Sequence, residues 1–392
     1  MRRDGGRLLS GCRRVRVRRE SLGWQVAVFL GVVAVPAMLL HAQEGNQTEW
    51  KAATPSYTLA FPRDHASHPD YKIEWWYYTG NLLTSDARRF GYQLTFFRIG
   101  VDPNPINPSR WAVRDLYMAH LAVTDVDGQT HQVAERLNRD GVGWAGASTE
   151  TLHVWNENWS ILLDGDTHIL RATTDDRMVR LDLQLEPLKA AVLHGDAGYS
   201  RKGAAAGNAS HYYSLTRLRT SGTLQLNGAT LNVEGQSWMD HEFGTSFLEP
   251  SQVGWDWFSI QLNDDTDVMV YVFRHPDGSI DPHSSGTVVG TSGITRLGAG
   301  DYQLVPGRVW ESPTSGAAYP VEWKIEIPQS DLVLNVAAAV DAQELHTDRS
   351  TGVIYWEGTI DVTGTRAGKQ VWGSGYLEMT GYAGRPMSEF FR

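Results

Sequence analysis

The sequence predicts an all-β protein whose mature region forms two β-domains. Apolar and polar residues alternate with a period of two in many short runs, as in antiparallel strands that bury one face. Turn pairs such as Asn227-Gly228 separate these runs, and no long stretch with a 3.6-residue period follows residue 42. Many short strands at regular spacing favour sandwiches or barrels.

The first 42 residues form a segment of their own. They contain eight arginines and two acids, and an apolar run from Val26 to Leu40 follows the basic part. This pattern, ending at Leu40-His41-Ala42, predicts a secretory signal peptide over residues 1–42 and a secreted or periplasmic protein. The run is short for a membrane span and contains Pro36, so we expect no membrane insertion after cleavage. An uncleaved N-terminal anchor is the alternative.

The net charge and cysteine content of the mature chain exclude some classes of binding partner and of chemistry. The whole chain has 35 Lys and Arg against 45 Asp and Glu, and without the signal 27 remain against 43, a net charge of −16. Such an acidic chain argues against nucleic acid and anionic lipid surfaces as partners. The only cysteine, Cys12, lies in the signal, so no disulfide and no thiol chemistry are expected. The sequence leaves the oligomeric state open.

Alternating runs predict the strands of the mature chain. In chain order they are 71–80, Phe90–Ile99, Leu116–Thr124, Trp159–Leu163, His168–Thr173, Arg180–Glu186, Thr223–Leu226, Trp255–Leu262, Val268–Phe273, Val321–Ile327, Leu332–Val336, Val353–Val362 and Val371–Met379.

Two breaks divide this series of strands. The glycine-rich stretch 189–210 predicts a long loop, and Leu248-Glu249-Pro250-Ser251 predicts a second break. We therefore expect an N-terminal domain over 50–247 and a C-terminal domain over 250–388. A cavity is expected at their junction, because ligand sites favour such positions.

Two segments near the N-terminus carry polar groups that could bind a metal or transfer a proton. His65 and His68 are three residues apart and could ligate a metal with Asp64 or Asp70, although loop-anchoring hydrogen bonds are the simpler interpretation. In the strand 71–80, Glu74, Trp76 and Tyr78 share one face and Trp75 and Tyr77 the other. A buried Glu74 needs a partner such as Arg98 or Arg114, or its pKa rises into the range of a general acid.

The densest cluster of ionisable groups lies at residues 237–257. Asp240, His241 and Glu242 are consecutive, with Trp238 before them and Trp255-Asp256-Trp257 after them. On a strand, Asp240 and Glu242 share a face and His241 takes the other. Charged groups buried among large rings must form ion pairs or shift their pKa values. Shifted pKa values are typical of acid–base sites, so the segment predicts such a site. The alternative is a surface turn between two strands. Tyr271 adds a ring, either to this site or to an ordinary strand. No phosphate loop and no dinucleotide fingerprint are present.

These motifs resemble a known family. Phe61–Pro69 followed by Glu74-Trp75-Trp76-Tyr77-Tyr78-Thr79-Gly80-Asn81-Leu82 resembles the start of the AttH-like family, which is similar to the carotenoid hydratases. Trp238–Gly244, Trp255-Asp256-Trp257, Tyr355-Trp356-Glu357-Gly358 and Gly375–Tyr382 also resemble that family, so the match covers most of the mature chain. The resemblance implies two lipocalin-like antiparallel β-barrels in tandem, with no metal and no organic cofactor.

The resemblance also implies a chemistry. Carotenoid hydratases protonate one carbon of an isoprenoid double bond and deliver water to the resulting cation. An Asp and a downstream Gly of the hydratases match Asp240 and Gly244, and their aromatic-Asp-aromatic element matches Trp255-Asp256-Trp257. Other relatives are fungal cyclases and many secreted proteins called hydrolases.

We therefore expect a protein that binds a small apolar ligand such as an isoprenoid or lipid. The predicted ligand-binding residues are Glu74, Trp76, Tyr78, Trp238, Trp255, Trp257 and Tyr271. As an enzyme it would use Asp240 or Asp256 as proton donor, and the rings of Trp255, Trp257 and Trp76 would stabilise a developing cation. His241 would position water or orient a carboxylate. The alternatives are a non-catalytic lipid carrier and a carbohydrate-acting protein, which would show exposed indoles in an open groove.

Overall fold

The computed structural model describes residues 49–205, 207–246, 248–291 and 293–384. The predicted signal peptide at 1–42 and the last residues of the predicted C-terminal domain lie outside this part of the chain. The described residues belong to one compact unit, which contains both sheets.

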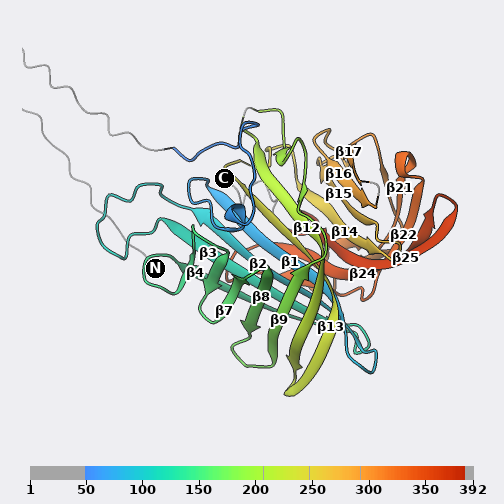
Figure 1. Cartoon of the computed structure of the whole chain (residues 1–392), viewed down its shortest axis with the longest axis horizontal. Helices are drawn as coiled ribbons and strands as arrows, with labels where there is room; N and C mark the ends of the chain where they lie inside the picture. The colour runs from blue at the N-terminus through green and yellow to red at the C-terminus, as the bar shows by residue number, and fades with distance from the viewer. Residues whose placement is uncertain (1–48, 206, 247, 292, 385–392) are drawn as a thin grey trace, which may run out of the picture. The chain divides into compact units, whose positions relative to one another are not determined.

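The first sheet contains thirteen antiparallel strands, drawn from blue to yellow-green in Figure 1. Their order is β4-β3-β2-β1-β13-β12-β9-β8-β7-β6-β5, with β10 and β11 also paired to β12. Contacts of β4 with β5 and β6 bring the two ends of the sheet together, so it forms a nearly closed barrel. The strands are β1 (Ile73–Leu83), β2 (Arg89–Gly100), β3 (Asp115–Asp125), β4 (Thr130–Arg139), β5 (Ala145–Ala147), β6 (His153–Asn156), β7 (Trp159–Asp164), β8 (Thr167–Thr173), β9 (Val179–Pro187), β10 (Val192–Leu193), β11 (Tyr199–Arg201), β12 (Ala209–Leu226) and β13 (Ala229–Gly244).

The second sheet contains ten strands, coloured yellow to red in Figure 1. Its order is β17-β16-β15-β14-β25-β24-β22-β21-β18, with β23 paired to β24, and it forms a curled half-barrel. Its strands are β14 (Gly254–Leu262), β15 (Asp267–Arg274), β16 (Ser285–Gly290), β17 (Gly293–Gly298), β18 (Gln303–Pro306), β21 (Glu322–Ile327), β22 (Leu332–Ala338), β23 (Glu344–His346), β24 (Ile354–Arg366) and β25 (Lys369–Met379). A separate ribbon joins β19 (Val309–Glu311) to β20 (Ala318–Pro320).

Helical structure is minimal in the described residues. It consists of two 3-10 turns, η1 (Arg63–His65) and η2 (Pro328–Ser330). No helix in this part of the chain has the length and apolar character needed to cross a membrane. The all-β prediction is confirmed.

The Asn227-Gly228 turn explains the longest hairpin of the molecule. Both residues have positive φ, 51° and 85°, and Leu226 pairs directly with Ala229 across the turn. Asn-Gly readily adopts this conformation, whose twist matches that of paired strands. The hairpin carries β12 and β13, so it places the acidic segment at 240–242 in the middle of the first sheet.

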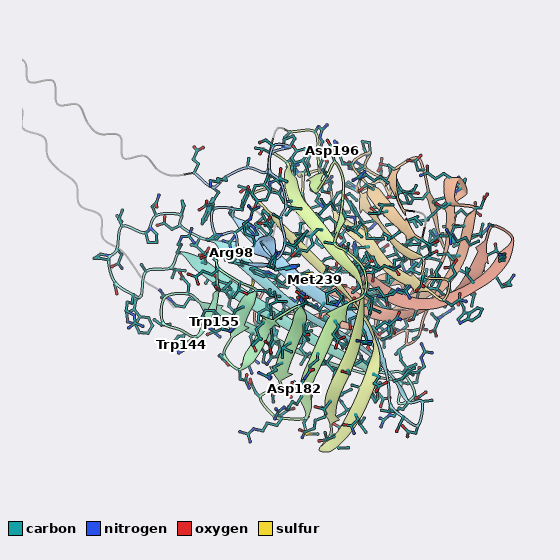
Figure 2. The ribbon with its side chains drawn as sticks, viewed as in Figure 1. Arg98, Trp144, Trp155, Asp182, Asp196 and Met239 are labelled. Atoms are coloured by element: carbon teal, nitrogen blue, oxygen red, sulfur yellow. The ribbon has the colours of Figure 1, made fainter. Side chains whose placement is uncertain are left out.

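Buried side chains form separate cores on the two faces of the strands. One fills the first barrel and includes Trp76, Tyr78 and Met239; Met239 is labelled in Figure 2. A second fills the concave side of the second sheet. A third, rich in aromatic rings, lies between the two sheets. The sheets approach closely at Gly91, where an added Cβ would lie 2.7 Å from Thr359 Cβ.

Candidate active site between the sheets

Alternation along β1 and β13 sends neighbouring residues to opposite faces of the first sheet. Trp75 and Tyr77 point away from the barrel interior, as do Asp240 and Glu242 on the adjacent strand. His241, between the two acids, points into the barrel, as the spacing predicts. The outer face of the barrel is therefore aromatic and acidic at this point.

Cross-strand pairing arranges these outer residues in rows. Asp240 pairs with Tyr77, Tyr77 with Thr95, and Thr95 with His120, so one row crosses four neighbouring strands. A parallel row two residues along the strands begins with Glu242 and Trp75 and continues to Phe97. These rows form the floor of a cavity.

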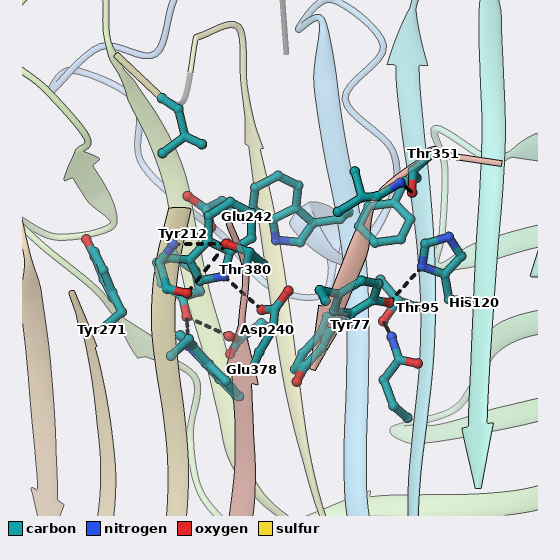
Figure 3. A pocket seen from close by; sticks show the side chains of 18 of the residues that line it. Tyr77, Thr95, His120, Tyr212, Asp240, Glu242, Tyr271, Thr351, Glu378 and Thr380 are labelled. Atoms are coloured by element: carbon teal, nitrogen blue, oxygen red, sulfur yellow. Dashed lines mark hydrogen bonds between the residues drawn. The ribbon is translucent and has the colours of Figure 1, made fainter. Parts of the chain in front are cut away.

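The second sheet supplies the roof of the same cavity. Trp257 pairs with Tyr271 on one side and with Glu378 on the other, and Glu378 pairs with Glu357 beyond it. Trp255, Phe273, Tyr355 and Thr380 complete this side. Figure 3 shows the acids Asp240, Glu242 and Glu378 near Tyr212, with Thr95 and His120 on the other side of Tyr77.

The cavity has a volume of about 100 Å³. An engineered cavity that binds benzene measures about 150 Å³, so this enclosed space is smaller than one ring needs, and a longer ligand must extend through its partly exposed edge. Trp75, Phe97, Trp255, Leu248 and Val353 at its edge are partly exposed, whereas the residues farther in are buried. The edge therefore gives access from solvent to a ring-lined interior.

Asp240 is a buried carboxylate held by three donors. Trp238 Nε1 donates to Oδ1 at 2.6 Å, Tyr212 OH donates to Oδ2 at 2.5 Å, and Ser214 Oγ also donates to Oδ1. Burial raises the pKa of Asp240 to about 7, although these hydrogen bonds act in the opposite direction. Trp257 Nε1 in turn donates to Tyr212 OH at 3.1 Å. The group is therefore both fixed in position and able to exchange a proton near neutral pH.

Glu378 is the second carboxyl group poised in this way. Burial raises its pKa to about 7; a hydrogen bond from Trp255 Nε1 at 3.0 Å opposes the shift, and the nearby Asp240 and Glu242 add to it. Glu378 also lies directly opposite Glu357, where like charges destabilise each other. Burial and Glu378 raise the pKa of Glu357 well above its usual value, and Tyr77 OH donates to its Oε1 at 2.6 Å. Burial and neighbouring carboxylates thus favour the protonated forms of Glu378 and Glu357.

One lysine balances part of this negative charge. Lys202 Nζ lies 2.6 Å from Glu242 Oε1, and both side chains are buried. The ammonium also sits 4.9 Å from the ring centroid of Tyr212 and 4.8 Å from that of Tyr271. Burial would lower the pKa of Lys202, but the Glu242 carboxylate holds it above its usual value. Lys202 therefore stays charged and occupied with Glu242.

The comparisons with known proteins agree with this architecture. A family model described as AttH-like matches residues 52–382, which is most of the chain. The chain belongs to the AttH-like family. The crystal structure of an AttH protein from Nitrosomonas europaea is 32% identical, with a TM-score of 0.77, and the match covers 85% of this chain and all of that one.

A second solved structure shares the fold of this AttH-like protein. It is kievitone hydratase from Nectria haematococca, 17% identical with a TM-score of 0.64, and the match covers 85% of this chain and 96% of that chain. The search of curated proteins gives no match. The prediction of a lipocalin-like, AttH-like fold is confirmed.

Several residues that the sequence singles out lie inside the first barrel of this AttH-like protein, outside the cavity. Glu74, Trp76 and Tyr78 are fully buried there, and His241 stacks on Trp76 with ring centroids 5.0 Å apart. Trp75 and Tyr77 line the cavity in their place. The reason is the period-two alternation of β1: rings occupy both faces, and the sequence alone does not show which face the second sheet covers.

The interior histidines anchor the loop that contains η1. His68 Nδ1 and His241 Nε2 each lie 2.9 Å from Glu74 Oε1, and His65 Nδ1 lies 2.7 Å from Tyr213 OH. The ligand atoms of His68, Glu74 and His241 all lie within 4.8 Å of one another, a spacing that a cation could use.

That interior group is nevertheless a closed hydrogen-bond network. Arg98, labelled in Figure 2, lies 3.1 Å from Glu74 Oε2, so a cation is already paired with this carboxylate. Burial would raise the pKa of Glu74, but His241, His68 and Arg98 hold it well below its usual value. We therefore assign the three residues to anchoring the loop, the simpler interpretation of His65 and His68.

Asp256 lies on the other face of β14 from Trp255 and Trp257. It is buried 3.1 Å from Arg274 Nε, and burial raises its pKa to about 6. It does not line the cavity between the sheets, unlike Trp255, Trp257 and Tyr271. Trp238 lies behind Asp240 and holds it through its Nε1.

Sequence reasoning did not single out three residues that complete the site. Glu378 belongs to a predicted strand, and Tyr212 belongs to a segment with adjacent tyrosines. Neither pattern indicates more than weakly that the residue lies in a ligand site. Lys202 comes from the stretch 189–210, which the sequence predicts as a loop; the structure adds the short strands β10 and β11 there. Only the packing of the second sheet against the first brings Glu378 to the cavity that Asp240 lines, and no local sequence pattern contains this contact.

Proposed function

We propose that this AttH-like protein is an enzyme that adds water to a carbon–carbon double bond of an apolar ligand held between its two sheets. One observation carries the proposal: Asp240 and Glu378, each with a pKa raised to about 7, come from opposite sheets and line one aromatic cavity. Carboxyl pairs with pKa values near the working pH are typical of acid–base catalysis.

The two carboxyls take complementary roles. Asp240 raises the pKa of Glu378, and both pKa values lie near 7, so near neutral pH one carboxyl is available as acid and the other as base. The protonated carboxyl gives its proton to one alkene carbon, and the oxygen of a water molecule bonds to the other carbon. The ionised carboxyl accepts the proton that this water loses. Proton exchange of each carboxyl with water then restores the starting state.

The ring lining supports the charged stage of this reaction. Trp255 and Trp257 present their indoles to the cavity, and a cation over such a ring gains about 0.5–2 kcal/mol. The buried and half-buried indoles also differ from the exposed platforms expected of a carbohydrate-acting protein. The fold is compatible with the proposed chemistry, since a protein named kievitone hydratase shares it.

The test uses water labelled with oxygen-18 and small acyclic alkenes. Purified protein is incubated at pH 7 with geraniol or myrcene, and products are identified by mass spectrometry. We expect an alcohol that carries one labelled oxygen, and a loss of about 10²–10⁴-fold in rate for D240N or E378Q. Asp182→Asn changes a partly exposed carboxylate on β9, outside the cavity, and is the matched control. Recovery of bound, unchanged alkene would instead identify a non-catalytic carrier.

A further inference from the structure

The spacing of the cavity floor fixes where a ligand can be held. Neighbouring strands lie about 4.7–4.9 Å apart, so Thr95, two strands from Asp240 in the same row, is about 10 Å away from it. Gln93 precedes Thr95 by two residues on β2 and lines the cavity beside it. The cavity therefore has an acidic end and, about 10 Å away, a second polar end.

Gln93 has an unused hydrogen-bonding atom at that second end. Its side chain is buried, with 1% exposure, and Nε2 donates to Thr95 Oγ1 at 2.5 Å. Oε1 has no partner among the residues that the structure describes. A buried acceptor without a partner destabilises the site, and a ligand that supplies a donor would remove that penalty.

The other groups at this end are already paired and uncharged. His120 Nδ1 lies 2.8 Å from Tyr355 OH, and His120 Nε2 lies 2.9 Å from Ser350 Oγ. Burial lowers the pKa of His120 to about 3, so the ring is neutral at physiological pH. No positive charge is therefore offered to an anionic group at this end of the floor.

The charge of the whole cavity also disfavours an anion. Asp240, Glu242 and Glu378 face it against a single lysine, and that lysine is paired with Glu242 at 2.6 Å. A carboxylate or phosphate on the ligand would lose its hydration without gaining a free cation in return. A hydroxyl has no such cost, and it can both donate and accept, so it pairs with the amide of Gln93 whichever way that amide is turned.

The geometry points to a neutral, largely apolar alkenol as the ligand, with its hydroxyl on Gln93 and its reacting double bond beside Asp240, two strands away. The position of the double bond beside Asp240 rests on the proposed function. The hydroxyl-binding role of Gln93 stands on the cavity alone.

Three probes of one carbon skeleton test the inference. Geraniol carries a hydroxyl, myrcene is the related hydrocarbon, and geranic acid carries a carboxylate. Affinities are measured by calorimetry at pH 8 on E378Q, so that turnover does not interfere, and repeated on the native chain. We expect geraniol to bind roughly tenfold more tightly than myrcene or geranic acid. In Q93L the dissociation constants of geraniol and myrcene should become about equal.

Two further variants make the result decisive. Gln184→Leu makes the same change on the exposed face of β9 and should keep the native ratio. Thr95→Val removes the hydroxyl that holds the Gln93 amide and should lower the geraniol preference even if Q93L does not fold. Equal binding of myrcene and geraniol, an unchanged ratio in Q93L or T95V, or tightest binding of geranic acid would overturn the inference. Failure of water addition with an intact geraniol preference would refute only the proposed reaction.

Discussion

Asp240 combines a fixed position with an adjustable charge. Three donors hold its oxygens, yet burial keeps its pKa near 7, far above the value of about 3.9 typical of a free aspartate. A carboxyl in this state exchanges protons at neutral pH without changing its place. The pH dependence of the protein follows from this property.

The first prediction concerns the pH dependence of the reaction. Because one carboxyl must be protonated and the other ionised, kcat/KM should be greatest near pH 7 and fall on both sides, about tenfold per pH unit at the extremes. Initial rates of labelled-alcohol formation from pH 5 to 9 measure this profile. In D240N only one titrating carboxyl of the pair is left, so one limb should disappear from any residual rate. A flat native profile would contradict the assignment of both groups.

The second prediction concerns the stability of the same site. The folded-state pKa of Asp240 lies above the unfolded value, so the folded state favours the protonated form. The stability that this group contributes is present below about pH 4 and is lost as the pH rises through about 7. Replacement by Asn removes that dependence, so D240N should gain about 1–4 kcal/mol relative to the native chain between pH 5 and pH 8.

Chemical denaturation at pH 5 and pH 8 measures that difference. Asp182→Asn, outside the cavity, should show no comparable change between the two pH values. Equal pH dependence of the native chain and D240N would mean that Asp240 is ionised throughout this range.

Strand β1 shows how much of the site the sequence could predict. Its alternating rings predict a strand with two buried faces, and the structure has that strand at Ile73–Leu83. The choice of the cavity face depends on what packs against it, which in this case is a sheet that begins about 170 residues later along the chain. Strand positions could therefore be predicted locally, whereas the site depends on contacts between distant strands.

The two faces of β1 should respond differently to substitution. Trp76→Ala removes a fully buried ring from the first barrel and should cost about 3–5 kcal/mol of unfolding free energy. Trp75→Ala removes a partly exposed ring from the cavity edge, so it should cost less stability and weaken geraniol binding several-fold. Urea denaturation and calorimetry separate the two effects. Stronger loss of binding in a folded W76A would show that the ligand enters the barrel.

At the scale of the whole molecule, the two sheets share a buried, hydrogen-bonded interface. Arg217 on β12 reaches across to Asp267 on β15 with 2.6 Å between Nη2 and Oδ1, and Gln261 donates to the backbone oxygens of Thr216 and Ser237. Polar groups buried in this way hold the sheets in one arrangement. The roof and floor of the cavity are thereby fixed relative to each other.

We expect the two sheets to unfold in a single transition. Arg217→Ala leaves Asp267 buried with less compensation and should lower the stability of both sheets by about 3 kcal/mol. Arg219→Ala breaks an exposed pair with Glu186 and should cost less than about 1 kcal/mol. Differential scanning calorimetry distinguishes these cases. Two separate transitions, with only one shifted in R217A, would show that each sheet is an independent domain.

The floor of the cavity is the outer surface of the first barrel, so a ligand can bind without entering the apolar core of either sheet. Asp240 and two of its donors, Trp238 and Ser214, belong to the first sheet, whereas most of the opposite wall comes from the later strands. A change in the size of Phe273 or Val353 on that wall would thus alter which ligand fits while leaving Asp240 in place.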